Sequence, residues 1–170
     1  MKMIRLFFLL SVISSCGRSN ENTISMTEQE IQEQLTNASK RRVQKESMEI
    51  NQFIKQKNFI TEESGTGLRI QIYSRAKNGI PPTLHEQVKI ICKVFLLDGT
   101  LCYETDTAHP VIFKLGEGEQ IRGLEEGLMK MIPGERARLI IPNHLAYSLS
   151  GDGDKIPPGA ALYIDVKLIK

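Results

Sequence analysis

The chain has 170 residues, of which 41% are hydrophobic and 25% charged, a composition typical of one globular domain with appendages. Its net charge of +2 includes Lys2 and Arg5, and without residues 1–15 it has as many acidic as basic residues. No basic field remains to attract nucleic acid, which excludes that class of partner. The cysteines and histidines show no metal-ligand spacing, so neither a metal nor a cofactor is predicted.

The first 15 residues have the layout of a secretory signal peptide. Basic residues precede the apolar run 6–13, which is too short to span a membrane, and small residues follow it. The end of this segment, Ile13-Ser14-Ser15-Cys16, resembles the bacterial lipobox, in which cleavage leaves the cysteine as a lipidated N-terminus. We therefore expect a lipoprotein signal peptide over 1–15 and lipidation of Cys16. The alternative is an ordinary signal peptide with an incidental cysteine.

A tether and a helix are expected next. Residues 16–26 are polar and unpatterned, which is typical of a tether. Thr27 and Glu30 have the spacing of a capping box, which starts a helix. From there to Lys57 the chain has neither glycine nor proline and is rich in good helix formers. We predict a helical spacer over 27–63.

The apolar stripe of this helix is interrupted, which leaves its role open. The stripe begins with Ile31 and Leu35 and fades at the Arg41-Arg42 pair. It resumes near the end of the helix with Ile50, Phe53 and Ile54. One interpretation is a charged spacer helix whose last turns pack on the following domain. The other is an arm that forms a homodimer.

Beyond residue 58 the apolar residues alternate with polar ones, the period of a strand. Alternation is clear in 68–73, 88–96, 135–142 and 160–169, and two shorter strand candidates lie at 100–104 and 111–115. The Asp98-Gly99 pair indicates a tight hairpin between two of them. These segments predict an antiparallel sheet of about five strands.

One short helix interrupts the strands. Residues 122–129 follow a turn and end before Pro133-Gly134. Its apolar positions recur every three or four residues and share one face: they are Ile121, Leu124, Leu128 and Met131. A helix of about three turns with one apolar face cannot stand alone in water. The sheet is therefore expected to wrap around it, which makes an α+β fold preceded by a charged N-terminal helix.

Four motifs in this region resemble FKBP-type peptidyl-prolyl cis–trans isomerases, in the order and spacing of that family. They are Asp98-Gly99-Thr100, the segment from Gly116 to Gly127, the segment from Met131 to Ala137, and Ile156-Pro157-Pro158-Gly159-Ala160. The match covers roughly 64–170, which we expect to be the isomerase domain. With the lipobox and the helical arm, the chain looks most like the gliding-motility-associated FKBP lipoproteins. The family fold is a curved antiparallel sheet around one short helix, which agrees with the pattern above.

The resemblance implies a catalyst that needs no nucleophile. Rotation about an X–Pro bond meets a barrier of ~20 kcal/mol, because the planar amide is stabilised by resonance. The twisted amide is less dipolar than the planar one, so an apolar pocket favours the transition state. Carried over from the family, the N–H of Ile121 and the hydroxyl of Tyr147 would donate to substrate carbonyls. Leu124 would form the floor of the pocket and Ile156 part of its wall.

Other expected substrate-binding positions depart from the family pattern. They are Cys92 in place of a Tyr, Cys102-Tyr103 in place of Phe-Asp, Val111 in place of a Phe, Gln120 in place of an aliphatic residue, Ile164 in place of a Phe, and Lys155 where apolar or aromatic residues are common. Asp152 departs from the family pattern in the same way as Lys155 but is not counted as a binding position. The loss of several rings would widen the pocket and remove contact surface.

Two functions therefore stay open. The first is a membrane-tethered, periplasm-facing isomerase that assists the folding of cell-envelope proteins and has proline-containing polypeptides as clients. The second is an FKBP-fold binding or chaperone module with little or no isomerase activity. The departures favour the second function, and the retained Ile121, Leu124, Tyr147 and Ile156 favour the first.

The two cysteines of the domain are a separate question. The family register implies that Cys92 and Cys102 both lie at the pocket, where an oxidising compartment would permit a disulfide. A strict two-residue turn would instead pair Phe95 with Cys102 and leave Cys92 on the opposite face. We expect two free thiols rather than a bridge.

Overall fold

The computed structural model describes residues 27–170. The signal peptide over 1–15, the tether over 16–26 and the lipidation of Cys16 lie outside the described residues and stay predictions. No helix in the described part of the chain is long and apolar enough to cross a membrane. Residues 37–170 form one compact unit. The contacts described below lie within this unit, except those of Thr27 and Glu30.

Helix α1 spans Glu28–Lys57 and begins with the predicted capping box. The Thr27 N–H donates to Glu30 Oε2 at 2.8 Å, and the Glu30 N–H donates to Thr27 Oγ1 at 3.3 Å. These reciprocal bonds satisfy N–H groups that the first turn of a helix leaves without partners. The helix ends at Lys57, before the end of the predicted spacer at residue 63. The last two residues of that spacer form strand β1 (Glu62–Glu63), which already belongs to the sheet.

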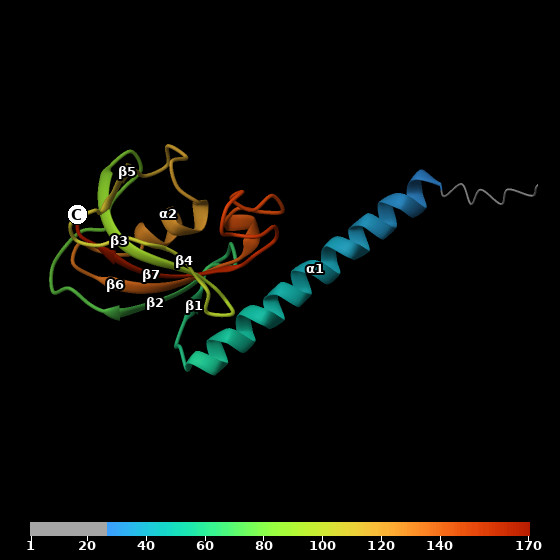
Figure 1. Cartoon of the computed structure of the whole chain (residues 1–170), viewed down its shortest axis with the longest axis horizontal. Coiled ribbons are helices and arrows are strands. Elements are labelled where there is room, and N and C mark those ends of the chain that lie inside the picture. The colour runs from blue at the N-terminus through green and yellow to red at the C-terminus, as the bar shows by residue number, and fades with distance from the viewer. Residues whose placement is uncertain (1–26) are drawn as a thin grey trace, which may run out of the picture. The chain divides into compact units, whose positions relative to one another are not determined.

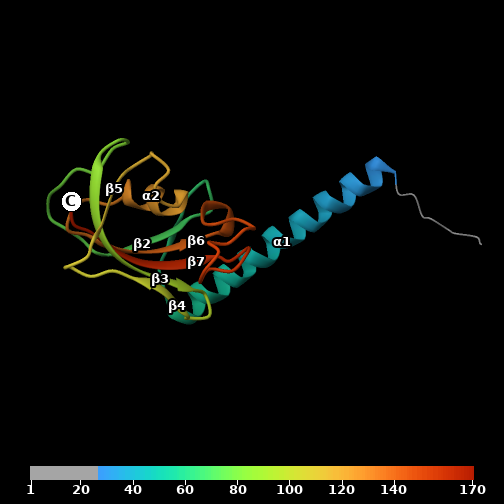
Figure 2. The same cartoon turned by 45° about the horizontal axis from the view of Figure 1, so that its top comes forward.

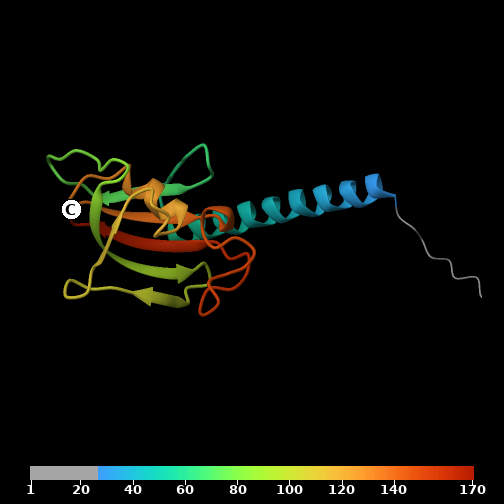
Figure 3. The same cartoon turned by 90° about the horizontal axis from the view of Figure 1, so that it is seen from above.

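The sheet is antiparallel throughout and has seven strands within the described residues, more than the five or so expected. The others are β2 (Arg69–Ser74), β3 (Gln87–Leu96), β4 (Leu101–Glu104), β5 (Val111–Lys114), β6 (Arg136–Ile141) and β7 (Leu162–Leu168). The strand order is β1-β2-β6-β7-β3-β4, and β5 pairs with β3. Seen from above, β2, β6, β7, β3 and β4 lie side by side in this order (Figure 3). A two-residue strand such as β1 has no period that a sequence could show.

Helix α2 (Arg122–Leu128) lies in the hollow of the curved sheet (Figures 1 and 2). This arrangement confirms the predicted α+β fold, although seven residues make about two turns rather than the three expected. Gly123 and Gly127 share one face of the helix and allow it to approach β6. A Cβ at position 123 would lie 2.3 Å from Ile141 Cγ2, and one at position 127 would lie 2.6 Å from Leu139 Cδ1.

The outer face of the sheet packs against the last turns of α1. Ile50 and Phe53 of the helix are buried there against Ile140. The ring centroid of Tyr163 lies 5.4 Å from that of Phe53 and 5.5 Å from that of Phe95. This packing confirms the interpretation in which the last turns of the helix pack on the domain. It covers the second face of the central strands.

The hairpin between β3 and β4 differs from the strict two-residue turn considered above. The Leu96 N–H donates to Thr100 O at 2.9 Å, which leaves a three-residue loop. Phe95 then pairs with Leu101 rather than with Cys102, and Val94 pairs with Tyr103, so Cys102 forms a bulge. The bulge turns Cys102 toward the core.

Both cysteines of the domain lie on the inner face of the sheet. Cys92 is 8% exposed and Cys102 is 3% exposed, and both belong to the same core cluster. They are free thiols, as expected. The extra residue of the bulge is the physical reason why the two side chains share a face despite the period of the strands.

Candidate active site

Most of the predicted site residues come together on the inner face of the sheet. Buried members of one core cluster are Cys92, Cys102, Leu124, Ile156 and Ile164. Half-buried side chains packed against that cluster are Tyr103, Val111, Ile121 and Tyr147. Two predicted residues lie outside it: Gln120 is half-buried, and Lys155 is exposed. The structure thus assembles an apolar wall from strands, helix and loop.

Ile121 presents a backbone donor at the start of α2. It has extended backbone angles (φ −64°, ψ 141°) at the N-cap, and its carbonyl accepts the N–H groups of Leu124 and Glu125 at 3.0 and 3.2 Å. Its own N–H has no hydrogen-bond partner within residues 27–170. This N–H is therefore available to a substrate carbonyl.

The connection that leads into Ile121 is held by a buried carboxylate. Glu125 is 8% exposed, and its Oε2 accepts the N–H of Gly116 at 3.2 Å. Its Oε1 is buried without a partner in the described part of the chain. The bond to Gly116 ties the connection before α2 to the first turn of that helix.

Tyr147 supplies a second available donor. It follows the short 3₁₀ helix η1 (Asn143–Leu145), and its ring packs against the core cluster. Burial, and then the negative charge of Asp152, raise the pKa of the Tyr147 phenol. The hydroxyl therefore stays protonated at neutral pH and can donate to a carbonyl.

Tyr103 occupies the position where the family pattern expects an Asp, and it is tied to the loop of residues 143–159. Its hydroxyl donates to Asp152 Oδ2 at 2.5 Å, and Asp154 Oδ2 lies 3.3 Å away. This bond raises the pKa of the Tyr103 phenol and lowers that of the Asp152 carboxyl. The ammonium of Lys155 lies 5.0 Å from the centroid of the Tyr103 ring. Strand β4 therefore lacks a carboxylate at the site, whereas the loop provides one.

Asp152 also holds a wall residue in place. Its Oδ1 accepts the N–H groups of Asp154 and Ile156 at 2.9 and 2.8 Å, and its own N–H donates to Ile156 O at 3.1 Å. Sequence reasoning identified Asp152 only as a departure from the family. The Asp-Gly-Asp spacing of a tight polar turn was its only signal.

Thr105 is a further residue that the sequence did not indicate. The N–H of Cys92 donates to Thr105 Oγ1, and the N–H of Thr105 donates to the carbonyl of Cys92, both at 2.9 Å. These bonds fix β3 where it passes the site. Burial raises the pKa of the Cys92 and Cys102 thiols, so both stay neutral and contribute apolar surface rather than a nucleophile.

The arrangement can therefore bind an extended peptide without reacting with it covalently. Ile121 and Tyr147, which carry the two candidate donors, both pack against the core cluster that contains the apolar wall residues. Among residues 27–170, no three His, Cys, Asp or Glu side chains gather as metal ligands would. This geometry suits the binding of an apolar residue whose flanking carbonyls need donors.

Comparison with known proteins identifies the family. The model of FKBP-type peptidyl-prolyl cis-trans isomerases matches residues 79–169. FK506-binding protein 1 of Dictyostelium discoideum is 36% identical over 104 residues, which are 61% of this chain and 96% of that protein. The chain belongs to the FKBP-type peptidyl-prolyl cis-trans isomerase family, as predicted from the motifs.

Other relatives extend the comparison. Peptidyl-prolyl cis-trans isomerase FKBP11 of Bos taurus is 39% identical over 89 residues, which are 52% of this chain but only 44% of that protein. Among solved structures, FkpA from Escherichia coli superposes with a TM-score of 0.62 at 26% identity, over 86% of this chain and 73% of that chain. AtFKBP13 superposes with a TM-score of 0.60, also at 26% identity, over 65% of this chain and 98% of that chain. These structures confirm the fold, whereas the gliding-motility-associated subtype stays a prediction.

Proposed function

We propose that this chain is a membrane-tethered peptidyl-prolyl cis–trans isomerase that assists the folding of cell-envelope proteins. The observation that carries the proposal is the pair of available donors, the Ile121 N–H and the Tyr147 hydroxyl, beside the apolar wall of a chain in this family. The clients would be polypeptides that contain proline.

The wall would stabilise the twisted amide more than the planar one. A proline ring placed against Leu124 and Ile156 would exclude water from the X–Pro bond. Solvent exclusion disfavours the more dipolar planar amide, which lowers the barrier of ~20 kcal/mol. The Ile121 N–H would orient one carbonyl and the Tyr147 hydroxyl a neighbouring one. No bond to the protein is made or broken.

The test is the isomerisation rate of an aryl-proline peptide, together with proline-limited refolding of a protein client. The chain should accelerate both, and a macrolide inhibitor of the family should abolish the acceleration. A folded chain that accelerates neither would contradict the proposal.

A second function, an FKBP-fold binding or chaperone module, is favoured by one observation. Cys92, Val111 and Ile164 give the wall sulfur and aliphatic surface where the family pattern has rings. Adding a ring should then separate the two functions. Val111 is half-buried, so a Phe there can extend toward solvent, whereas Cys102 is 3% exposed and a Phe there would overpack the core.

If the site is an isomerase weakened by these departures, Val111→Phe should raise turnover by up to about tenfold, which corresponds to about 1.4 kcal/mol of transition-state stabilisation. Thermal unfolding should first establish that the variant is folded. An unchanged rate in a folded variant would favour the binding module.

The tether rests on the lipobox at Ile13-Ser14-Ser15-Cys16. A lipidated Cys16 would place the domain at the cell envelope, facing the periplasm. Labelled fatty acid should enter the wild-type chain and not Cys16→Ala. Equal labelling of both would contradict the tether and leave the isomerase proposal untouched.

A homodimer through the first turns of α1 is a separate proposal, and the packing of the last turns on the domain is compatible with it. Ile31 and Leu35 are exposed on this helix, at 45% and 58%, and a second copy could cover them. Light scattering of the purified chain should give twice the chain mass. A monomer at high micromolar concentration would contradict the dimer.

A further inference from the structure

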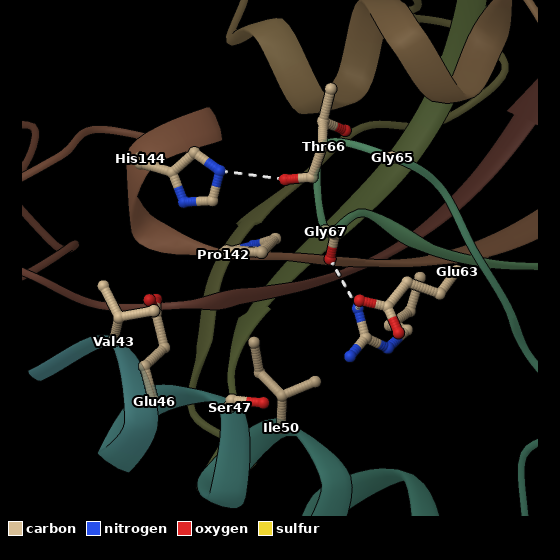
Figure 4. Close-up of a pocket in the computed structure, with 11 residues that line it drawn as sticks. Val43, Glu46, Ser47, Ile50, Glu63, Gly65, Thr66, Gly67, Pro142 and His144 are labelled. Atoms are coloured by element: carbon tan, nitrogen blue, oxygen red, sulfur yellow. Dashed lines mark hydrogen bonds and ion pairs between the residues drawn. The ribbon is translucent and has the colours of Figure 1, made fainter. Parts of the chain in front are cut away.

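A glutamate outside the family-matched segment contacts the loop that carries Tyr147. Glu46 belongs to α1 and is 9% exposed, and its Oε1 accepts the N–H of Asn143 at 2.6 Å. Figure 4 shows its side chain leaving α1 on the side that faces Pro142 and His144. The two bonded residues are 97 positions apart in the sequence. A carboxylate that accepts a backbone N–H makes a short and comparatively strong bond.

Asn143 determines the course of this loop. Its carbonyl accepts the N–H groups of Ala146 and Ser148 at 3.0 and 2.8 Å, one on each side of Tyr147. Its side-chain amide donates to Gly159 O at 3.5 Å, at the far end of the loop. The residue that Glu46 holds is therefore the one that fixes the backbone around the Tyr147 hydroxyl.

The loop between β1 and β2 ties the same region to α2. His144 Nε2 lies 2.9 Å from Thr66 O, and the Thr66 hydroxyl donates to Glu126 Oε2 at 2.7 Å. The first of these bonds is drawn in Figure 4. Glu126 lies on α2, which begins directly after Ile121. The β1–β2 loop is therefore bonded both to the loop that carries Tyr147 and to the helix that follows Ile121.

The surroundings of Glu46 would allow the loop to move if the bond were lost. An open cavity of about 290 Å³ lies between α1, the β1–β2 loop and Pro142, and Glu46 lines it. Leu145 and Tyr147 pack the loop on the core, but on the side that faces α1 the cavity offers no close packing. On that side the Glu46 carboxylate supplies a restraint that packing does not.

We propose that Glu46 is a positioning residue of the isomerase site. It holds Asn143, and through Asn143 it holds the Tyr147 hydroxyl where a substrate carbonyl can accept its hydrogen bond. The inference rests on the proposed isomerase function. It also makes α1 part of the catalytic unit, so that residues 64–170 alone would lack a component of the site.

The experiment compares three variants of the full chain. Glu46→Ala removes the acceptor, and Glu46→Gln retains an oxygen that can accept the Asn143 N–H. Glu49→Ala is the matched control, because Glu49 lies on the same helix and its one ion pair within residues 27–170 is with exposed Lys45. We expect kcat/KM for an aryl-proline peptide to fall about tenfold in Glu46→Ala, by less than about threefold in Glu46→Gln, and not at all in Glu49→Ala.

Val88→Ala separates positioning from stability. Val88 is buried in β3, outside the site, and its truncation should lower the melting temperature as Glu46→Ala does. If Val88→Ala lowers kcat/KM as much as Glu46→Ala does, the effect is one of stability and the proposal is wrong. The proposal is also wrong if Glu46→Gln is as inactive as Glu46→Ala.

Amide hydrogen exchange gives a readout that needs no activity. In Glu46→Ala, exchange at Asn143 and Ser148 should accelerate by about tenfold or more while the β3 amides stay protected. Unchanged exchange at these two amides would overturn the positioning role, whatever the kinetics. A wild-type chain with no isomerase activity would refute the proposed function, and the exchange data would still decide whether Glu46 holds the loop.

Discussion

The two faces of strands β3 and β7 carry different chemistry. On the inner face, Cys92 and Ile164 belong to a core that contains α2 and the candidate site. On the outer face, Phe95 and Tyr163 stack with their centroids 5.5 Å apart and pack near Phe53 of α1. The aromatic rings of this pair of strands therefore lie on the outer face, where Tyr163 contacts Phe53 of the helix that carries Glu46.

The outer face is also where a cation is stacked between rings. The guanidinium of Arg138 lies 4.5 Å from the centroid of Phe59 and 4.4 Å from that of Tyr73. Such contacts suit a half-exposed face, because they combine apolar contact with a charge that stays near water. The inner face instead relies on close packing of aliphatic side chains. The inner face therefore holds the core around α2, and the outer face joins α1 to the sheet.

The largest loss of stability should come from creating a cavity in the core on the inner face of the sheet. Leu124→Ala removes a side chain that is 3% exposed and lies on the buried face of α2. The cavity it leaves should lower the free energy of unfolding by about 3–5 kcal/mol. Urea unfolding measures this change, and Leu149→Ala, at a position 58% exposed, is the control. A loss under about 1 kcal/mol would mean that α2 does not anchor the core.

The outer face should be the weaker of the two. Phe53 is 4% exposed, but neighbours such as Phe59 and Tyr163 are only half-buried and can close around a gap. Phe53→Ala should therefore cost about 2–3 kcal/mol, less than a Phe in a closed core. The same urea measurement applies, with Met48→Ala as the control at a position 70% exposed. A cost above that of Leu124→Ala would reverse the comparison.

The elements that pack on both faces could be predicted from the sequence, whereas the hydrogen bonds between distant residues could not. Alternation of apolar residues indicated the strands, and the stripe resuming at Ile50 and Phe53 indicated a packed helix end, because burial imposes a period on a sequence. The family motifs indicated the apolar wall around Leu124. What pattern could not show are bonds between distant residues, such as Glu46 with Asn143. A hydrogen bond between residues so far apart leaves no recognisable pattern in the sequence around either of them.

The family register correctly placed Cys92 and Cys102 on one face, but the bulge that brings them there could not be predicted from the local sequence, for a related reason. One extra residue at Cys102 changes the register of β4, yet the Asp98-Gly99 pair favours a two-residue turn. The observed loop is decided by which side chains fill the core, a tertiary effect that local preference does not contain. The pairing of Tyr103 with Asp152, 49 residues apart, is likewise tertiary.

A smaller effect tests whether the two faces divide their roles. Tyr147→Phe deletes one hydroxyl from the inner face and keeps the ring, so the domain should stay folded. A lost neutral hydrogen bond is worth about 0.5–1.5 kcal/mol, or about two- to tenfold in kcat/KM on an aryl-proline peptide. Tyr163→Phe deletes a hydroxyl from the outer face and should leave the rate unchanged. Equal rates for Tyr147→Phe and the wild type would remove Tyr147 from the site.

The smallest effect concerns the rim of the inner face, where Tyr103 donates to Asp152. This bond lowers the pKa of the Asp152 carboxyl in the folded state. A carboxyl with a lowered pKa contributes stability above its unfolded pKa, about 3.9 for Asp, and loses that contribution as the pH falls through the folded pKa. The wild type should therefore be more stable than Tyr103→Phe at pH 7, and the difference should shrink below about pH 4.

Urea unfolding at neutral and acidic pH would measure this difference, and Asp152→Asn is the matched control because it removes the titrating group. Its free energy of unfolding should decline less steeply below about pH 4 than that of the wild type. The alkaline side has the opposite sign. The bond also raises the pKa of the Tyr103 phenol, so its contribution is complete below about pH 10 and is lost above that. If the difference between wild type and Tyr103→Phe stays constant from pH 7 to pH 3, the two side chains are not coupled, and Asp152 serves only to hold the backbone of Ile156.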